Sequence, residues 1–360
     1  TALMEVNSVP ELILIEKQVP GAVHFEPEAP KPGRYPGVPE ADYFAAKAVN
    51  ASTLKHMGRS ALHCKAEMTR SDERPDTEAK KVGRLIHCAE LEPERFAAEY
   101  VREPTAEDFP GCLVSHEDYK AQAKEFGLKV GGSKADLKTR ICEHMIDAAV
   151  ELLGDRDEHE LEGEEAKRHQ FLACPEWLFF DDIHGMITFS KTPLKADHWF
   201  LAHSIIESIA ASPKAASALS GGVAEETLLW RDALNGLLCK SRMDYYREDL
   251  AAIVDVKTTE DARPEAVARD IQKYGYHISA AHYLDGLRSL GLPGGQTFVW
   301  VVVEKKPPHA VALYVASEAM LERGEELRRQ HLGNFARCKL SGMWPGYSNE
   351  FETIDLPAWA

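Results

Sequence analysis

Three strand-like segments follow one another closely in the second half of the chain, and they restrict its fold more than any other feature. They cover residues 225–230, 236–246 and 251–256, with short polar connections between them. Segments joined in this way predict a meander of hairpins. The pattern then predicts helices over about 264–290 and 317–338, and apolar strands at 297–303 and 310–315. Together these elements predict an α/β (α+β) fold in which helices cover the faces of a central sheet.

The first half of the chain is predicted to be largely helical after an irregular start. Residues 1–45 are rich in proline, so they are expected to form an extended arm with at most one short strand, at 12–15. Helices are then expected from Asn50 or Ser52 to Leu62, over 82–91, as a separate pair within 112–150, and near 165–173 and 195–219.

One face of the middle strand segment carries charged residues where a sheet normally buries apolar ones. Side chains alternate across a strand, so Lys240, Arg242 and Asp244 are predicted to share a face. Asp255 and Lys257 share a face of the next segment for the same reason. The opposite face of the middle segment begins with Cys239 and is predicted to belong to the core.

The hairpin turns predict how these charged residues meet. A turn near 248–249 would place Asp244 opposite about residue 253 and diagonal to Asp255, at a spacing of roughly 7 to 8 Å between backbones. A similar estimate for the preceding hairpin sets Glu226 near Arg242, on the same face. Three carboxylates and the nearby Lys257 are therefore expected to converge.

Such a cluster suits metal-assisted hydrolysis of a phosphodiester. Oxygen ligands favour Mg²⁺ or Mn²⁺ over zinc, and such an ion can neutralise a phosphate and lower the pKa of an attacking water. Lys257 would orient or deprotonate that water, or stabilise charge on the phosphate. The alternative is an exposed salt bridge, because a D-x-K tripeptide occurs often by chance. Glu226, Asp244 and the hairpin register favour the catalytic interpretation.

These residues resemble a known family. The segments E-T-L-L-W (226–230), C-K-S-R-M-D (239–244) and D-V-K-T-T (255–259) are similar to the PD-(D/E)xK nuclease core, in particular to the RecE (exonuclease VIII) branch of phage and prophage exonucleases. Upstream, Gly83 and His87 resemble that branch's G-x-x-x-H helix, which L-E-P-E-R-F (91–96) follows. Downstream, Gln272 and Tyr276 fit a Q-x-x-x-Y element. The resemblance implies a mixed sheet flanked by helices over residues 46–360.

The resemblance also implies a role for each matching residue. His87, Asp244 and Asp255 would be metal ligands, Lys257 the catalytic lysine and Glu226 an accessory acid. For His87, the alternative is a buried core histidine on an apolar helix face.

Four further residues around this centre are expected to meet DNA. Gln272 and Tyr276 would face DNA or the lysine, and their i, i+4 spacing places both on one face of a helix, although a packed tyrosine would show the same spacing. Lys240 and Arg242 would clamp a phosphate, or else act as counter-ions of the acidic cluster.

The helix pair within 112–150 is similar to the SAP motif, a small DNA-binding unit, and would be an insert in the nuclease domain. Its cations, among them Lys134, Lys138 and Arg140, form one of the few basic stretches of the chain. They are expected to contact the DNA backbone. The alternative is an amphipathic hairpin that only braces the nuclease or a neighbouring subunit.

The formal net charge of −16 is unusual for a protein that binds DNA, because phosphate contacts need local positive charge. Relatives in the resembled family close into rings around DNA. A ring-shaped homo-oligomer, a trimer or tetramer, would reconcile an acidic exterior with a basic channel. No apolar run approaches the roughly 20 residues of a membrane-spanning helix, so a cytoplasmic protein without membrane contact is expected.

The resemblance implies an Mg²⁺-dependent exodeoxyribonuclease. It would degrade linear double-stranded DNA from its 5′ ends and leave 3′ single strands for a RecT-like single-strand annealing protein. Two alternatives remain open. One is a single-strand or repair/CRISPR-type nuclease of the same fold, and the other is a non-catalytic DNA-binding scaffold that uses the SAP-like insert.

Overall fold

The computed structural model describes residues 25–70, 77–173, 178–348 and 350–356. The strand expected at 12–15 lies outside these residues. The chain forms two compact units, one made of the residues up to Pro93 and from Ala202 onward, and the other of Glu94–Leu201. Within the described residues, no helix is both long and apolar enough to cross a membrane.

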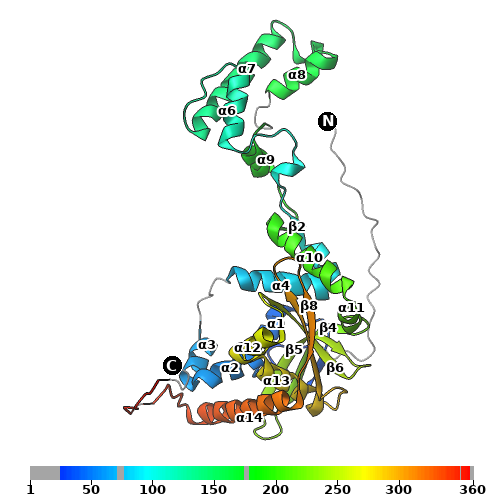
Figure 1. Ribbon diagram of the computed structural model, residues 1–360, viewed down its shortest axis with the longest axis vertical. Coiled ribbons are helices and arrows are strands. Elements are labelled where there is room, and N and C mark those ends of the chain that lie inside the picture. Colours follow the sequence, from blue (N-terminus) through cyan, green and yellow to red (C-terminus); the bar gives the residue numbers. More distant parts are fainter. Residues whose placement is uncertain (1–24, 71–76, 174–177, 349, 357–360) are drawn as a thin grey trace. The chain divides into compact units, whose positions relative to one another are not determined.

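A six-stranded mixed sheet forms the centre of the first unit (Figure 1). Its strands are β1 (Gly33–Tyr35), β4 (Val223–Arg231), β5 (Leu238–Arg247), β6 (Ala252–Thr259), β7 (Thr297–Glu304) and β8 (Val311–Val315), in the order β1-β4-β5-β6-β7-β8. Strands β6 and β7 are parallel, and the other neighbours are antiparallel. The predicted α/β class and the meander of β4, β5 and β6 are confirmed.

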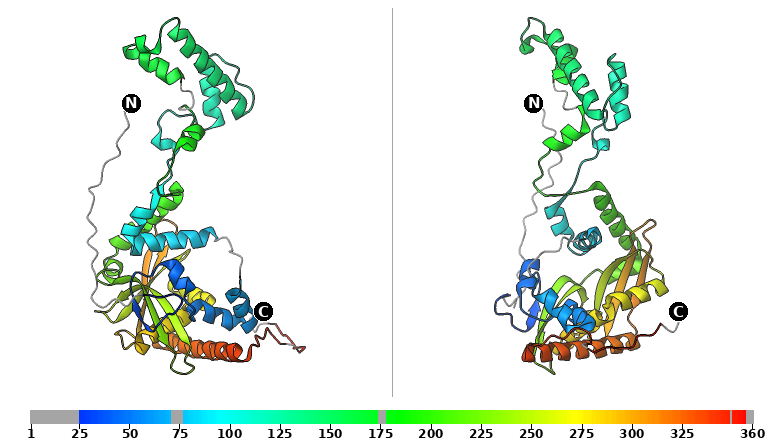
Figure 2. Two further views of the ribbon diagram at one scale, coloured as in Figure 1. Left: turned by 180° about the vertical axis from the view of Figure 1, so that it is seen from behind. Right: turned by 90° about the vertical axis from the view of Figure 1, so that its left-hand side faces the viewer.

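Helices flank this sheet. They are α1 (Glu40–Ala45), α2 (Ala51–Arg59), α3 (Ala61–Met68), α4 (Glu78–Leu91), α10 (Ala196–Ala211), α11 (Pro213–Ala218), α12 (Pro264–Tyr274), α13 (Tyr276–Ser289) and α14 (Glu318–Ser341). Helix α13 contacts β4, β5 and β7, whereas α4 contacts β5 and β6. Helix α14 packs on α13 and α2, and both views of Figure 2 show it below the blue α2.

The helix expected near 195–219 is divided into α10 and α11, which Ser212 separates. Two further predicted helices are each divided. Ser60 ends α2 and caps α3, because its side chain accepts a hydrogen bond from the backbone N–H of His63. Gly275 separates α12 from α13 at a φ of +65°, in the left-handed region that glycine adopts easily. The prediction of one continuous helix was wrong at both places, because each break depends on a single residue inside an apolar pattern.

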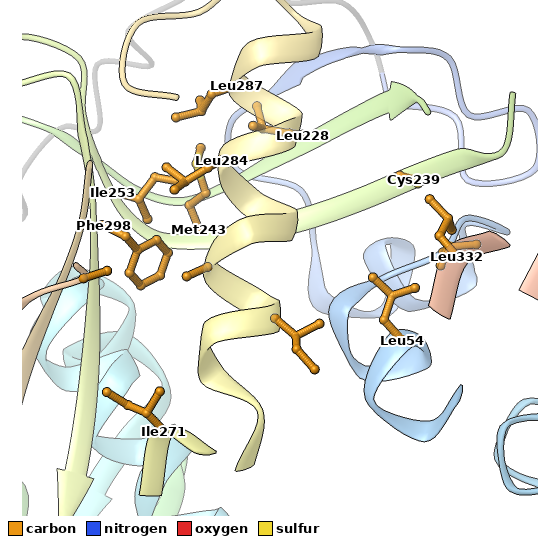
Figure 3. Close-up of a cluster of buried hydrophobic side chains, with 14 of the residues drawn as sticks. Leu54, Leu228, Cys239, Met243, Ile253, Ile271, Leu284, Leu287, Phe298 and Leu332 are labelled. Atoms are coloured by element: carbon orange, nitrogen blue, oxygen red, sulfur yellow. The ribbon is translucent and has the colours of Figure 1, made fainter. Parts of the chain in front are cut away.

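The main core lies between the sheet and helices α2, α13 and α14. Leu284 and Leu287 of α13 pack with Met243, Ile253 and Phe298 from three strands, as Figure 3 shows. All five side chains are buried. Burial of such side chains stabilises the fold by roughly 1.5 to 3 kcal/mol each, and it fixes the strands that carry the charged residues.

The described part of the predicted arm, residues 25–45, holds a strand and a helix. Strand β1 pairs with β4, and α1 follows it. Tyr35, Val38 and Tyr43 pack on Leu229 of β4 in a small core of their own. The proline-rich composition concealed these elements, because a three-residue edge strand has almost no sequence pattern.

The second unit is a helical insert larger than the predicted 112–150. It holds the short parallel strands β2 (Tyr100–Arg102) and β3 (Thr192–Leu194), most of helix α5 (Pro93–Glu99), and helices α6 (His116–Glu125), α7 (Lys134–Leu153), α8 (Gly163–Ala173) and α9 (Phe180–Met186). Tyr119, Leu137, Ile141 and Phe179 form its core. The predicted helix pair corresponds to α6 and α7, and α8 and residues 178–179 complete its packing.

Candidate metal centre

Asp244 lies where strands β5 and β6 separate. Their pairing ends just before it, and Asp244 Oδ2 accepts a hydrogen bond of 2.9 Å from the backbone N–H of Val256. The carboxylate thus replaces a backbone acceptor. The predicted register, with Asp244 opposite residue 253, was wrong by two residues, because Ile253 pairs with Tyr246. An even shift keeps each side chain on its face, and Asp244 acts electrostatically on Asp255 as predicted.

Asp255 and Lys257 form a close ion pair beside Asp244. Lys257 Nζ lies 2.6 Å from Asp255 Oδ2 and 3.5 Å from Asp244 Oδ2. Burial and the nearby Asp244 raise the pKa of Asp255 to about 7, against the opposing effect of Lys257. Burial also acts to raise the pKa of Asp244, but Lys257 and His87 outweigh it and hold that pKa below its ordinary value. Two neighbouring carboxyls with such divergent pKa values are typical of functional sites.

His87 reaches this pair from α4. Thr77 caps the helix by accepting a hydrogen bond from the backbone N–H of Lys80, and Leu85 and Ile86 are buried next to His87. His87 Nδ1 lies 3.5 Å from Asp244 Oδ2. Burial lowers the pKa of His87 more than Asp244 raises it, which favours the neutral imidazole that a metal ion requires.

The acid nearest to His87 and Asp244 is Glu225, not the predicted Glu226. Potential ligand atoms of His87, Glu225 and Asp244 all lie within 4.8 Å of one another. Glu226 pairs with Met243 rather than with Arg242, a shift of one residue from the predicted register.

A shift of one residue reverses the face of a strand. The Glu226 carboxylate is therefore buried against Arg34, with Arg34 Nε 2.5 Å from Glu226 Oε1. The interpretation of Glu226 as an accessory acid of the site is corrected to Glu225. Glu225 also has a φ of +50°, a costly conformation for a residue with a side chain and one that is concentrated at functional sites.

The donors present fit a divalent cation. Potential ligand atoms of His87, Glu225 and Asp244 lie within 4.8 Å of one another, and Asp255 lies beside this group with its Oδ2 2.6 Å from Lys257 Nζ. Buried carboxylates normally pair with a cation or bind a metal ion. Because the donors are mostly hard oxygen atoms, Mg²⁺ and Mn²⁺ suit them.

Comparison with known proteins identifies the family of this chain. Residues 50–357 match the family described as "PDDEXK-like domain of unknown function (DUF3799)". The chain belongs to this family. The DUF3799 match includes the helix of His87 and the strands of Asp244 and Asp255, so the PD-(D/E)xK fold predicted from the sequence is confirmed.

Two solved structures are similar to the DUF3799 chain. One is a candidate exonuclease from Eubacterium rectale, at 16% identity and a TM-score of 0.36, with 79% of this chain and 97% of that chain covered. The other is a phage-related exonuclease from Haemophilus somnus 129PT, at 14% identity and a TM-score of 0.25, with 66% and 99% covered. A search of curated proteins found no match.

Tyr276 and Gln272 of the DUF3799 domain do not share a helix face as predicted. Gly275 ends α12 between them, so the i, i+4 argument does not apply. The Tyr276 ring centre lies 5.6 Å from Lys257 Nζ, which agrees with the predicted position of Tyr276 beside the lysine. Gln272 lines a different cavity, together with Lys55.

Two residues near the DUF3799 metal centre were missed by the sequence interpretation. Lys55 of α2 lies with its Nζ 5.4 Å from the Tyr276 ring centre. Burial and the nearby Lys257 lower the pKa of Lys55 to about 8, against the opposing effect of Asp255. Burial raises the pKa of Tyr283 on α13, and Asp244, Asp255 and Glu225 lie close enough to raise it further. Neither belongs to a motif, and only the packing of α2 and α13 brings them to the site.

Lys240 and Arg242 of the DUF3799 domain hold its N-terminal segment instead of facing a phosphate. Lys240 is buried, and its Nζ donates to the carbonyl oxygens of Tyr43 and Ala46 at 2.5 and 2.7 Å. Arg242 donates to the carbonyl oxygen of Val38 at 2.5 Å and lies 3.9 Å from Glu225. The prediction that Lys240 and Arg242 clamp a phosphate is therefore corrected. Lys240 anchors α1, and Arg242 is a counter-ion of the acidic cluster.

The basic residues of the SAP-like helices are likewise engaged within their own unit. Lys134 Nζ lies 2.9 Å from Asp181, and Lys138 forms an ion pair with Asp182 of the same helix, α9. Arg140 donates to the backbone carbonyls of the loop before α7. These contacts stabilise the insert itself, and the predicted DNA contact of these cations stays a prediction.

Proposed function

We propose that the chain is a divalent-metal-dependent deoxyribonuclease. The observation that supports this most is the convergence of Asp244, Asp255 and Lys257 where β5 and β6 separate, with His87 and Glu225 beside them. Buried charges cost stability, and here they stand together with perturbed pKa values, which is typical of functional sites. Membership of the PDDEXK-like family supports the same chemistry.

Each residue of the centre has a task in phosphodiester hydrolysis. His87, Glu225, Asp244 and Asp255 would hold the metal ion, Mg²⁺ or Mn²⁺, which when bound neutralises phosphate charge and lowers the pKa of water. The Lys257 ammonium, kept in place by Asp255, orients the attacking water or balances the charge that develops on the phosphate.

A cleft of about 730 Å³ adjoins the centre and provides room for the substrate. His87, Lys257 and Tyr276 line it. The rest of the lining holds both signs of charge, and Lys305 pairs there with Glu260 at 2.6 Å. This volume is within the range of pockets that hold a molecule the size of a nucleotide. The cleft therefore suits one nucleotide unit of a nucleic acid strand at the metal centre.

The finer function follows from the resemblance to the RecE branch. We propose digestion of linear double-stranded DNA in the 5′ to 3′ direction, which leaves 3′ tails for a RecT-like annealing protein. A ring-shaped trimer or tetramer would place the clefts around the duplex, and it would explain how a chain with a net charge of −16 approaches DNA.

Digestion of linear duplex DNA labelled at either end tests this function. Loss of the 5′ label in Mg²⁺ and not in EDTA is expected. Asp255→Ala and Lys257→Ala should abolish it, with Lys257→Ala losing at least about 100-fold in rate. Lys306→Ala is the matched control, because Lys306 is exposed and pairs with Glu260 outside the centre.

Three results would contradict parts of the proposal. A duplex that survives Mg²⁺ and Mn²⁺ would refute the nuclease, and digestion that begins at the 3′ label would refute the polarity. Faster digestion of single strands than of duplex would favour a repair-type nuclease of the same fold. Light scattering of the purified protein measures the oligomer, and a monomer would refute the ring.

A further inference from the structure

A second cavity, of about 630 Å³, lies in the same unit as the metal centre and is lined by positively charged and aromatic residues. They come from α2, α12, α13 and α14, and are Lys55, Lys273, Tyr274, His277, Arg323 and His331. No aspartate or glutamate belongs to the lining that the described residues form. In a chain with a net charge of −16, this concentration of cations is a local exception. We call the cavity the cationic pocket.

The pocket holds three cationic side chains, Lys55, Lys273 and Arg323, beside two histidines. Burial lowers the pKa of His277, and Arg323 and Lys55 lower it further against a hydrogen bond to the Ile271 carbonyl. Burial also lowers the pKa of His331, which favours neutral imidazoles at both positions. Arg323 pairs with Glu326 at 2.5 Å, and both side chains are mostly exposed, so solvent screens this pair. The positive charge of the pocket therefore comes from its two lysines and from Arg323.

The cationic pocket adjoins the catalytic cleft. Ile271, Lys273 and Tyr274 line both. Between them lies Tyr276, whose ring centre is 5.4 Å from Lys55 Nζ and 5.6 Å from Lys257 Nζ. One lysine of the pocket and the lysine of the centre therefore share one aromatic wall.

The pocket also presents an aromatic surface. Tyr274 is 47% exposed and stacks on Tyr276, with ring centres 5.6 Å apart and planes at 29°. Lys273 Nζ lies 5.0 Å from the centre of the Tyr274 ring. An exposed ring with a cation over it, beside a cationic groove, is the arrangement by which proteins hold single strands, because bases stack on the ring and phosphates contact the cations.

We propose that the cationic pocket binds the phosphate backbone of a single DNA strand next to the phosphodiester in the metal centre, and that a base of this strand stacks on Tyr274. The role as part of a substrate path rests on the proposed nuclease function. The strand contact itself does not require catalysis, since it depends on charge and stacking alone.

Binding of a fluorescent single-stranded oligonucleotide in EDTA, measured by anisotropy at several salt concentrations, tests the pocket without catalysis. The double variant Lys273→Gln/Arg323→Gln should bind more weakly and reduce the slope of log affinity against log salt by about 1.4, or about 0.7 for each contact. Tyr274→Ala should weaken binding about fivefold or more, and Tyr274→Phe should retain it. Arg329→Gln/Lys339→Gln removes an arginine and a lysine from α14 outside the pocket and is the matched control.

The outcomes separate the pocket from the nuclease. If the pocket variants bind the strand as the unchanged protein does, or no more weakly than the α14 control, the pocket proposal is overturned. If the pocket variants lose affinity for the strand while the unchanged protein fails to cut DNA in Mg²⁺, the proposal of strand binding is supported and the proposal of nuclease activity is refuted. A deoxynucleoside monophosphate is then added as a competitor. If it displaces the labelled strand as strongly as an unlabelled oligonucleotide does, the pocket binds free nucleotides, and the proposal that it binds a DNA strand is overturned. Lys273→Gln alone, at an exposed position, replaces the double variant if the latter does not fold.

Discussion

Replacing one carboxylate of β4 at a time tests which of two neighbouring acids, Glu225 or Glu226, takes part in metal binding. Glu225→Gln should weaken binding of Mn²⁺, whereas Glu226→Gln should leave it unchanged. The two side chains lie on opposite faces of β4. Potential ligand atoms of Glu225, His87 and Asp244 lie within 4.8 Å of one another, whereas Glu226 pairs with Arg34. Glutamine has nearly the same shape as glutamate, so the two variants differ from the protein chiefly in charge.

The expected magnitude follows from the distances. Two unit charges about 4 Å apart interact by ~4 kcal/mol at the effective dielectric constant of a protein surface, and a divalent ion doubles this. The ligands that remain and the water that replaces the carboxylate offset most of it. Loss of even an outer-shell partner weakens metal sites about 10- to 100-fold. Glu225→Gln should therefore weaken Mn²⁺ binding by at least about tenfold, which is ~1.4 kcal/mol.

Glu226→Gln should act on stability instead. The Glu226 side chain is 1% exposed and accepts a charge-assisted hydrogen bond from Arg34. Loss of such a buried bond costs roughly 1 to 3 kcal/mol, which chemical denaturation would detect as a lower midpoint.

Titration calorimetry with Mn²⁺, without DNA, measures both variants beside the unchanged protein. If Glu226→Gln weakens the metal and Glu225→Gln does not, the register of β4 and β5 in this structure is wrong. If neither does, the acid of β4 takes no part in the centre, and only His87, Asp244 and Asp255 remain as candidate ligands.

Three further predictions concern stability and the insert. Arg328 is buried and pairs with Asp232, Asp285 and Glu325, so Arg328→Ala should lower the free energy of unfolding by about 3 to 5 kcal/mol; a loss below about 1 kcal/mol in urea denaturation would contradict a buried network. Burial raises the pKa of Glu90 from 4.5 to about 7, so the folded state holds a proton that the unfolded state releases, and stability should fall as pH rises between these values. Glu90→Gln should flatten this decline, and an unchanged pH profile would refute the assignment. Lys134→Gln/Lys138→Gln should lower the melting temperature by a few degrees at most and leave DNA affinity unchanged, whereas a marked loss of affinity would restore the SAP-like role of these lysines.

The strands of the two central motifs, and the faces on which their acidic residues lie, could be predicted because their signals are local. Alternation of polar and apolar residues fixes the period of a strand, so Asp244 and Asp255 were placed correctly even though the turn estimate was two residues off. The same method failed for Glu226, where the error was one residue and the face reversed. Hairpin register depends on the conformation of the turn and on the left-handed backbone at Glu225, which the sequence pattern does not report.

Contacts between distant segments could not be predicted from the pattern. Lys55 and Tyr283 reach the centre only because α2 and α13 pack around the same core, and β1 pairs with a strand almost 200 residues later in the chain. Helix breaks at Ser60 and Gly275 were missed for a different reason. Each is decided by one capping residue, whose effect of about 1 kcal/mol is small beside the apolar pattern that surrounds it.

Charge on the face of a buried strand has two different uses in this protein. Along β5, Asp244 belongs to the metal centre, whereas Lys240 and Arg242 on the same predicted face hold backbone carbonyls of the N-terminal segment. Both uses look alike in the sequence, because alternation shows only that a charged residue points inward. The partner distinguishes them. A cation whose hydrogen bonds end on carbonyl oxygens is structural, whereas carboxylates that face one another across a cleft need a cation from solution. By this criterion the carboxylates beside His87 are the candidates for a metal ion, and the cations near Tyr274 are the candidates for a phosphate chain, as proposed above.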